Sequence, residues 1–332
     1  MRTTILSLAA LTLATSAAAQ SSPSQSDTPA PSPAPAETSP LQTAQSEILV
    51  EGDRERRRTI NAYIADIMEE ESSGQYARFD APICPSFSGF SENVVAFMEQ
   101  RVRDVAKAAD VKAAEPGCKG NVLVRVVEDG PATINTMRAR HKGAFGTMLP
   151  YERRKIAEGQ GPAYVWHLVT STGADDGSNR DEPGAGLSND FGGDGGAYSM
   201  LSSDMFKTGK SNTKSLILQP VRQAITHAFV LIEEDAALGL SPLQIADYAA
   251  VMALARSSGD TEAARRVSTI RALFDTPRDE APELLSDWDL ALLKSLYAAQ
   301  TNLRAGQQRS AMTRMFEKTL VENESEGEND PG

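Results

Sequence analysis

The chain has 332 residues, of which 40% are hydrophobic, and its formal net charge is −12. This acidic balance argues against nucleic-acid binding and against electrostatic attachment to anionic lipid, because both depend on a basic surface. Roughly 280 residues lie outside the two biased ends described below, enough to bury a sizeable core.

The first twenty residues carry the strongest signal in the chain. Arg2 precedes an apolar run from Ile5 to Ala14, and small residues then lead to a cleavage site between Ala19 and Gln20. The run is too short to span a bilayer, and no later stretch approaches about 18 consecutive apolar residues. We therefore expect a signal peptide over residues 1–19, a mature chain without a membrane span, and a periplasmic or secreted location.

Two segments have compositions typical of disorder. Residues 20–46 are rich in Pro, Ser and Ala, and residues 321–332 are acidic and contain Gly and Pro. Such segments cannot bury enough apolar surface to offset their ordering entropy. The sequence thus predicts a spacer, a single globular α/β domain over residues 47–320, and a disordered tail.

The clearest unit of the predicted domain is a strand, a helix and a second strand. Ile83–Phe90 reads as a strand and turn, and Ser91 is placed to cap a helix that ends near Asp110. Asn121–Val127 is nearly continuous apolar sequence, which is typical of a strand buried in a parallel sheet.

The only two cysteines, Cys84 and Cys118, flank this helix. In an exported chain a single pair most simply bonds to itself. Closing this loop would stabilise the fold by about 3–4 kcal/mol in the chain-entropy model. The alternatives are a free thiol and a nucleophilic cysteine, although neither residue has a CxxC or nearby His partner.

Further strands and helices alternate along the rest of the chain. Strands are expected over Ala163–Thr170 and Ile225–Glu233, and an aperiodic Gly- and Asp-rich loop over Gly173–Gly209. Helices are expected over Thr59–Met68, Ile134–His141, Tyr151–Ile156, Ser241–Ala255, Glu262–Phe274, Ser286–Tyr297 and Gln307–Leu320. The predicted fold class is α/β (α+β), a mixed sheet flanked by helices with a helical C-terminal part.

The sequence contains few patterns that indicate catalytic chemistry. The three histidines lie singly on separate elements, and the chain has no HExxH, CxxC or GxSxG motif, so we predict no metal and no cofactor. The weak catalytic candidates are Glu234, a carboxylate at a strand end, with His227 and Asp247. Four aspartates of the long loop could supply oxygen ligands to calcium, but their spacing fits no known calcium loop: Asp175, Asp176, Asp190 and Asp194.

Several motifs together resemble a family of uncharacterised secreted proteobacterial proteins. They are Ala77–Phe79 leading to Ile83–Pro85, Gly117–Lys119 before Asn121-Val122, Gln244–Ala250, and Ser286–Asp289 with Leu296-Tyr297. This resemblance covers most of residues 54–320, and the family has no activity that can be transferred.

A fainter resemblance is to secreted zincin-like domains. The helix Ser241–Ala255 would take the place of their zinc helix, but it carries Asp247 and Tyr248 and no histidine. The resemblance therefore implies a zincin-like scaffold without its metal site. A shared fold does not by itself imply a shared function.

Three functions remain open at this point. The first is a non-catalytic periplasmic binding or interaction protein with an unknown envelope or periplasmic partner. The second is a hydrolase with an unrecognised site, and the third is a structural component of the cell envelope.

Overall fold

The computed structural model describes residues 52–159, 161–174, 218–258, 262–267 and 269–328. The predicted signal peptide, the spacer and the four loop aspartates lie outside these residues. So does almost all of the loop predicted over Gly173–Gly209.

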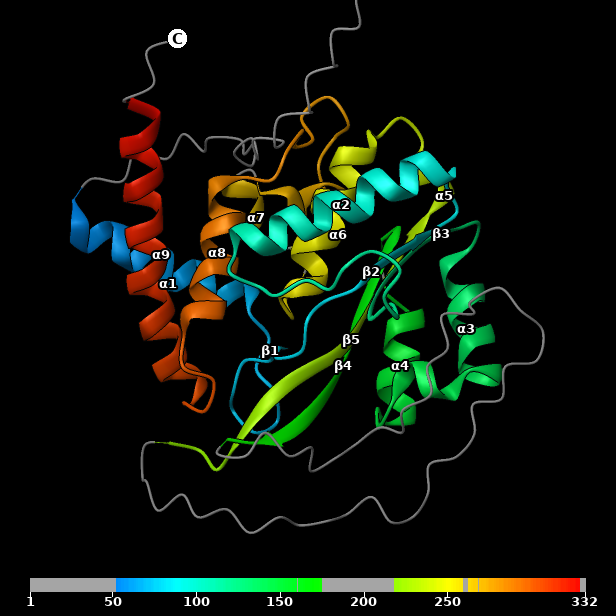
Figure 1. Cartoon of the computed structure of the whole chain (residues 1–332), viewed down its shortest axis with the longest axis horizontal. Coiled ribbons are helices and arrows are strands. Elements are labelled where there is room, and N and C mark those ends of the chain that lie inside the picture. The colour runs from blue at the N-terminus through cyan, green and yellow to red at the C-terminus, as the bar shows by residue number, and fades with distance from the viewer. Residues whose placement is uncertain (1–51, 160, 175–217, 259–261, 268, 329–332) are drawn as a thin grey trace, which may run out of the picture. The chain divides into compact units, whose positions relative to one another are not determined.

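One long strand, β5 (Val221–Glu233), organises a mixed sheet (Figure 1). Along one edge β5 pairs in parallel with β1 (Arg78–Phe79) and then with β3 (Val122–Val127). Along its other edge it pairs antiparallel with β4 (Ala163–Gly173). β2 (Pro85–Ser88) adds to β3 in parallel. The predicted α/β class with a mixed sheet is thereby confirmed, with β4 and β2 at opposite edges.

The larger core lies on the sheet face that presents Val122, Val124, Ala228 and Val230. Helices on this side in Figure 1 bury their apolar faces in one cluster. They are α1 (Asp53–Ile67), α2 (Glu92–Ala108), α6 (Pro242–Leu254), α8 (Asp287–Ala298) and α9 (Ala305–Glu328). The capping boxes of Ser241 with Gln244 and of Ser286 with Asp289 start α6 and α8.

The smaller core lies on the opposite face, around Trp166, Phe229 and Leu231. It is covered by α3 (Gly130–Arg140), the 3₁₀ helix η1 (Lys142–Phe145) and α4 (Pro150–Ala157). β2 therefore continues into α2 on one face, whereas β3 continues into α3 on the other.

The predicted disulfide is confirmed. Cys84 and Cys118 are bonded, with their Cα atoms 6.0 Å apart. The bridge joins the residue before β2 to the segment leading into β3. Asn121 adds hydrogen bonds across the same junction, accepting from the backbone N–H of Cys84 at 2.6 Å and donating to the carbonyl of Pro82 at 3.1 Å.

Three helices differ from the sequence-based expectation. α1 begins at Asp53 and takes in the basic run 54–58, where Arg57 pairs with Glu317 of α9. The helix predicted over Glu262–Phe274 is wrong: the structure has α7 (Glu262–Arg266) and the separate 3₁₀ helix η2 (Ile270–Ala272). The Asp289 carboxylate accepts the N–H of Ile270 at 2.8 Å and fixes this second start.

α9 also runs on to Glu328, through residues 321–328 that the sequence assigned to a disordered tail. Two contacts hold this extension against the domain. Asn323 donates to Asp287 at 3.2 Å, and Glu324 lies 3.5 Å from Arg56 of α1.

Candidate functional site

The three weak catalytic candidates lie on three different parts of the fold. Glu234 is exposed at the start of α5 (Glu234–Ala237), directly after β5. His227 lies within β5, where burial lowers its pKa to about 4. Asp247 is fully buried on α6 and binds Arg101. Of the three, only Glu234 lines either of the two hollows described below.

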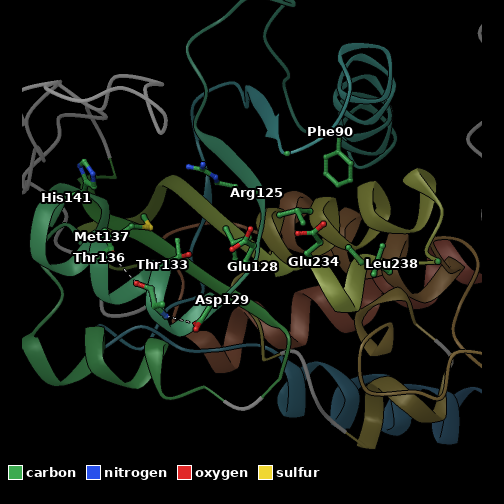
Figure 2. A pocket seen from close by; sticks show the side chains of 16 residues that line it. Phe90, Arg125, Glu128, Asp129, Thr133, Thr136, Met137, His141, Glu234 and Leu238 are labelled. Atoms are coloured by element: carbon green, nitrogen blue, oxygen red, sulfur yellow. Dashed lines mark hydrogen bonds between the residues drawn. The ribbon is translucent and has the colours of Figure 1, made fainter.

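The first hollow is a cavity of about 840 Å³ beyond the carboxyl ends of β2, β3 and β5 (Figure 2). Helices following the neighbouring strands β2 and β3 cover opposite faces of the sheet, so this is a topological switch point, where open α/β sheets commonly bind ligands. Phe90, Arg125, Glu128, Glu234 and His141 contribute to its lining.

The helix N terminus in this cavity already has protein partners. Asp129 accepts the N–H of Ala132 at 2.8 Å, and Glu233 accepts the N–H of Gly130 at 3.1 Å. The Tyr164 hydroxyl donates to the same oxygen of Glu233 at 3.0 Å. Because carboxylates satisfy these backbone donors, the start of α3 is poorly suited to an added anion.

The second hollow follows the outer edge of β4 and measures about 820 Å³; we call it the β4 groove. Its floor is the seven consecutive residues Val165–Ser171. One wall consists of residues 69–72 with Arg256 and Ser257, and the other of residues 145–148 with part of α4. Among the described residues, β4 has backbone pairing to β5 alone, so its outer edge faces this groove.

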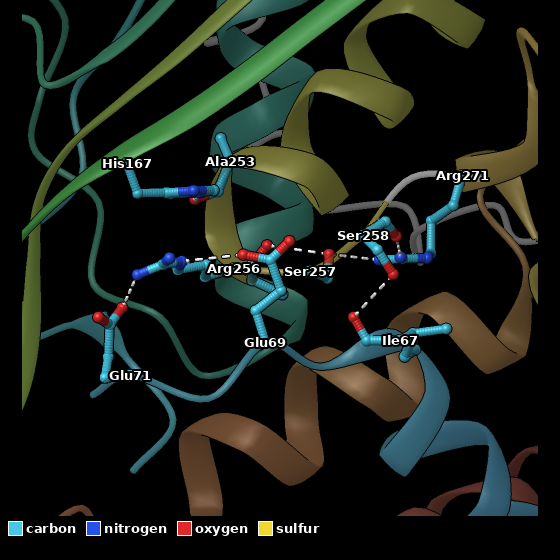
Figure 3. Close-up of polar contacts among 10 residues, drawn as sticks. Ile67, Glu69, Glu71, His167, Ala253, Arg256, Ser257, Ser258 and Arg271 are labelled. Atoms are coloured by element: carbon cyan, nitrogen blue, oxygen red, sulfur yellow. Dashed lines mark hydrogen bonds and ion pairs between the residues drawn. The ribbon is translucent and has the colours of Figure 1, made fainter. Parts of the chain in front are cut away.

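A short antiparallel contact builds the first wall (Figure 3). Ser258 N–H donates to the carbonyl of Ile67 at 2.9 Å, and Glu69 N–H donates to the carbonyl of Arg256 at 3.2 Å. The Arg256 guanidinium then binds two carboxylates, Glu69 at 3.1 Å and Glu71. One cation thereby holds residues 69–71 beside the end of α6.

A buried arginine anchors the same wall to the domain interior. Arg271 is fully buried and donates to the Ser257 hydroxyl and to the Ser258 carbonyl (Figure 3). A buried guanidinium must be hydrogen-bonded to be tolerated, so these contacts fix the backbone at residues 257–258.

Stacked aromatic rings join the second wall to the floor of the groove. The Trp166 ring lies nearly parallel to Phe145 and Phe229, with centroids 5.5 and 4.8 Å away. Its indole N–H donates to the carbonyl of Ala144 at 2.8 Å. Arg153 of α4 donates to the Met148 carbonyl at 2.8 Å and holds the loop that precedes α4.

Three polar residues of β4 lie at the floor of the groove: His167, Thr170 and Ser171. His167 Nε2 is 3.1 Å from the carbonyl of Ala253, which can only accept, so this nitrogen carries the proton. Burial, and then the charge of Arg256, lowers the pKa of His167 to about 4, which keeps the ring neutral near pH 7. Thr170 is 4% exposed, and its buried hydroxyl has no hydrogen-bond partner among the described residues.

Sequence reasoning identified β4 as a strand but not this groove. Its walls come from segments far apart in the chain, and neither Thr170 nor Arg256 belongs to a recognisable motif. The sequence predicted a strand without a formal charge over Ala163–Thr170, which the structure extends to Gly173, but it did not predict that this strand lies at the sheet edge.

The described part of the chain has neither a cluster of metal-ligating side chains nor a helix that could cross a membrane. No three or more His, Cys, Asp or Glu side chains are grouped to hold a metal ion. Within those same residues, no helix combines the length and apolar character needed to cross a bilayer.

Comparisons of the chain with known protein families, curated proteins and solved structures found no match. The two resemblances described above therefore stay predictions.

Proposed function

We propose that this protein is an exported binding protein that holds an extended segment of a partner protein as an added strand along β4. The observation that carries the proposal is the outer edge of β4, which is long and uncharged, lies along a walled groove and has no strand paired to it among the described residues. Adding a strand to a sheet edge is a common mode of peptide recognition: main-chain hydrogen bonds provide affinity and side-chain pockets provide specificity.

The two edges of the sheet differ in a way that supports this function. Proteins protect exposed edges with charges, proline, bulges or short strands, since an open edge invites pairing with other chains. β2 has four residues. β4 has 11, without Lys, Arg, Asp, Glu or Pro. The one irregularity in its pairing with β5, between Leu168 and Val169, leaves Thr226 of β5 as the extra residue, so the bulge lies on β5 and not on β4. Such an edge favours an occupant.

The floor of the groove supplies a group suited to that occupant. A buried hydroxyl without a partner costs free energy, and a bound strand offers carbonyl and N–H groups at regular spacing. Thr170 therefore gains a partner when a segment enters. The neutral His167 adds no charge repulsion or attraction on this floor.

The proposed export is supported by the predicted signal peptide and by the bonded cysteine pair. Disulfides persist in exported proteins and are rare in the cytosol. Sequencing the mature N terminus tests this part: cleavage after Ala19 gives a chain that begins at Gln20.

The groove is tested with Thr170→Val, and the probe is a library of acetylated, amidated random decapeptides. Valine removes the hydroxyl at nearly constant volume. We expect unchanged or greater stability, because a buried unsatisfied group is lost, and roughly 5–10-fold weaker peptide binding, because one hydrogen bond is lost in the complex. Unchanged affinity for the selected peptides would contradict a role for Thr170.

A matched control lies two residues away. Thr172 is equally buried, but its hydroxyl accepts from Arg222 at 3.3 Å and the residue does not line the groove. Thr172→Val should lower stability and leave peptide affinity unchanged. N-methylation of alternate peptide bonds in a selected peptide should also abolish binding; binding that survives at every methylated position would reject strand addition.

The other two functions have less support. The hydrolase alternative would need its candidate groups to converge, whereas Asp247 is held in a buried ion pair and His227 lies away from Glu234 on β5. No observation favours a structural envelope role over binding.

A further inference from the structure

We infer that the segment bound in the β4 groove carries a basic side chain beside the wall formed by residues 69–71. The inference rests on the proposed function and specifies the chemistry of the partner. It comes from the charge balance of the groove and from the unpartnered hydroxyl of Thr170 on its floor.

The first wall holds more negative charge than its one cation can balance. Arg256 is shared by Glu69 and Glu71, whose side chains are 47% and 14% exposed. Glu70 lies between them, is exposed, and has no ion pair among the described residues. Two carboxylates on this wall are therefore left without a cation of their own.

The residues that line the opposite wall do not supply the missing positive charge, because Arg153 of α4 does not line the groove and is bound to the carbonyls of Gly146 and Met148. Lys155 lies 5.9 Å from the centroid of the Tyr151 ring, and Glu152 accepts the backbone N–H of Leu149 at 2.6 Å as part of the α4 cap. The two charges cancel locally. The groove as a whole thus has two more carboxylates than cations.

A lysine or arginine on the bound segment would balance this charge. Attraction between opposite charges is stronger in a partly desolvated groove than in water, and like charges juxtaposed there disfavour binding. The net charge of −12 over the whole chain acts in the same direction at long range. An acidic segment would be repelled both within the groove and at long range by the net charge of the chain.

Three pools of the decapeptide library test the inference, identical except that one central position is fixed as Lys, Gln or Glu. We expect the Lys pool to be retained about 10-fold better than the Glu pool at low salt, corresponding to about 1.4 kcal/mol. The difference should shrink strongly in 1 M NaCl, where the Debye length is about 3 Å.

Glu70→Gln should reduce the preference for Lys over Glu several-fold. Glu262→Gln removes a carboxylate that is 71% exposed and outside the groove, and should leave the preference unchanged. Equal retention of the three pools, or better retention of the Glu pool, overturns the inference and leaves strand addition standing. Retention of no pool above background rejects the proposed function, and the inference with it.

Discussion

Arg101 and Asp247 join the middle of α2 to the middle of α6 through paired hydrogen bonds of 2.6 Å, Nε to Oδ1, and 3.0 Å, Nη2 to Oδ2. Asp247 Oδ2 also accepts the N–H of Leu285 at 2.8 Å. The carboxylate therefore connects three segments of the larger core, and its environment accounts for its burial without any catalytic role.

Asp247→Ala should destabilise the protein by about 3–5 kcal/mol, because the 10%-exposed Arg101 side chain loses its counter-charge. Chemical denaturation measures the change. Glu262→Gln is the surface control: it removes an exposed pair with Arg266 and should cost at most about 0.5 kcal/mol. If Asp247→Ala lowers the free energy of unfolding by no more than the control does, the buried ion pair contributes little to stability.

The disulfide should contribute about 4 kcal/mol, since the bonded cysteines are 34 positions apart. We expect Cys84→Ser/Cys118→Ser to lower the free energy of unfolding by this order. The matched measurement is the wild-type protein with and without reductant, which should show a similar difference. Reductant should not change the stability of the double variant.

Asp289 should make stability fall as pH rises from 4 to 6. Burial raises the pKa of its carboxyl to about 6, from an ordinary value near 3.9. Between these values the folded state holds a proton that the unfolded state has released. The stabilisation is complete below pH 4 and is lost as pH rises through 6.

Asp289→Asn isolates this effect. All three hydrogen bonds to the carboxylate end on Oδ2, so an amide oxygen there can accept them. Relative to wild type, the free energy of unfolding of the variant should increase by up to about 3 kcal/mol as pH rises from 4 to 7. A difference that does not vary with pH would contradict the raised pKa.

His167 should have the opposite effect on the pH dependence of stability. Its pKa is lowered to about 4, so the unfolded state binds a proton between pH 4 and 6.5 that the folded state does not. Its stabilisation is present above pH 6.5 and is lost as pH falls to 4. His167→Gln should remove this loss, and unfolding free energies of the two proteins across that range are the measurement.

Fluorescence of the two tryptophans can show where the peptide binds, because each tryptophan lies in a different core. Trp166 lines the β4 groove, whereas Trp288 packs edge-on against Tyr63 and Phe316 in the larger core. In Trp288→Phe, peptide binding should change the emission of Trp166. In Trp166→Phe, binding should leave Trp288 emission unchanged. Equal responses would place the binding event elsewhere.

Local sequence patterns predicted much of the fold. Caps and apolar periodicity located α6 and α8, and the continuous apolar run located β3, because short-range chemistry determines these features. The helix expected over residues 262–274 failed for a long-range reason. Its break depends on Asp289, which is distant in sequence and hydrogen-bonds to Ile270.

The candidate site was far less predictable. Asp247 was proposed from its place on a helix, but its arginine partner lies on α2, more than a hundred positions earlier. The β4 groove depends on which strand is at the edge and on two walls brought together by folding. Neither can be deduced from the period of a single segment.

The central position of β5 has a consequence for the order of folding. β1 pairs with it through Arg78 and Ala224, so the sheet cannot be completed until nearly 150 further residues have been made. Contacts this distant in sequence slow folding. The strands β2 and β3, tied by their disulfide, are both present early in the chain, whereas β1, β3 and β4 all need the later strand β5 as their partner.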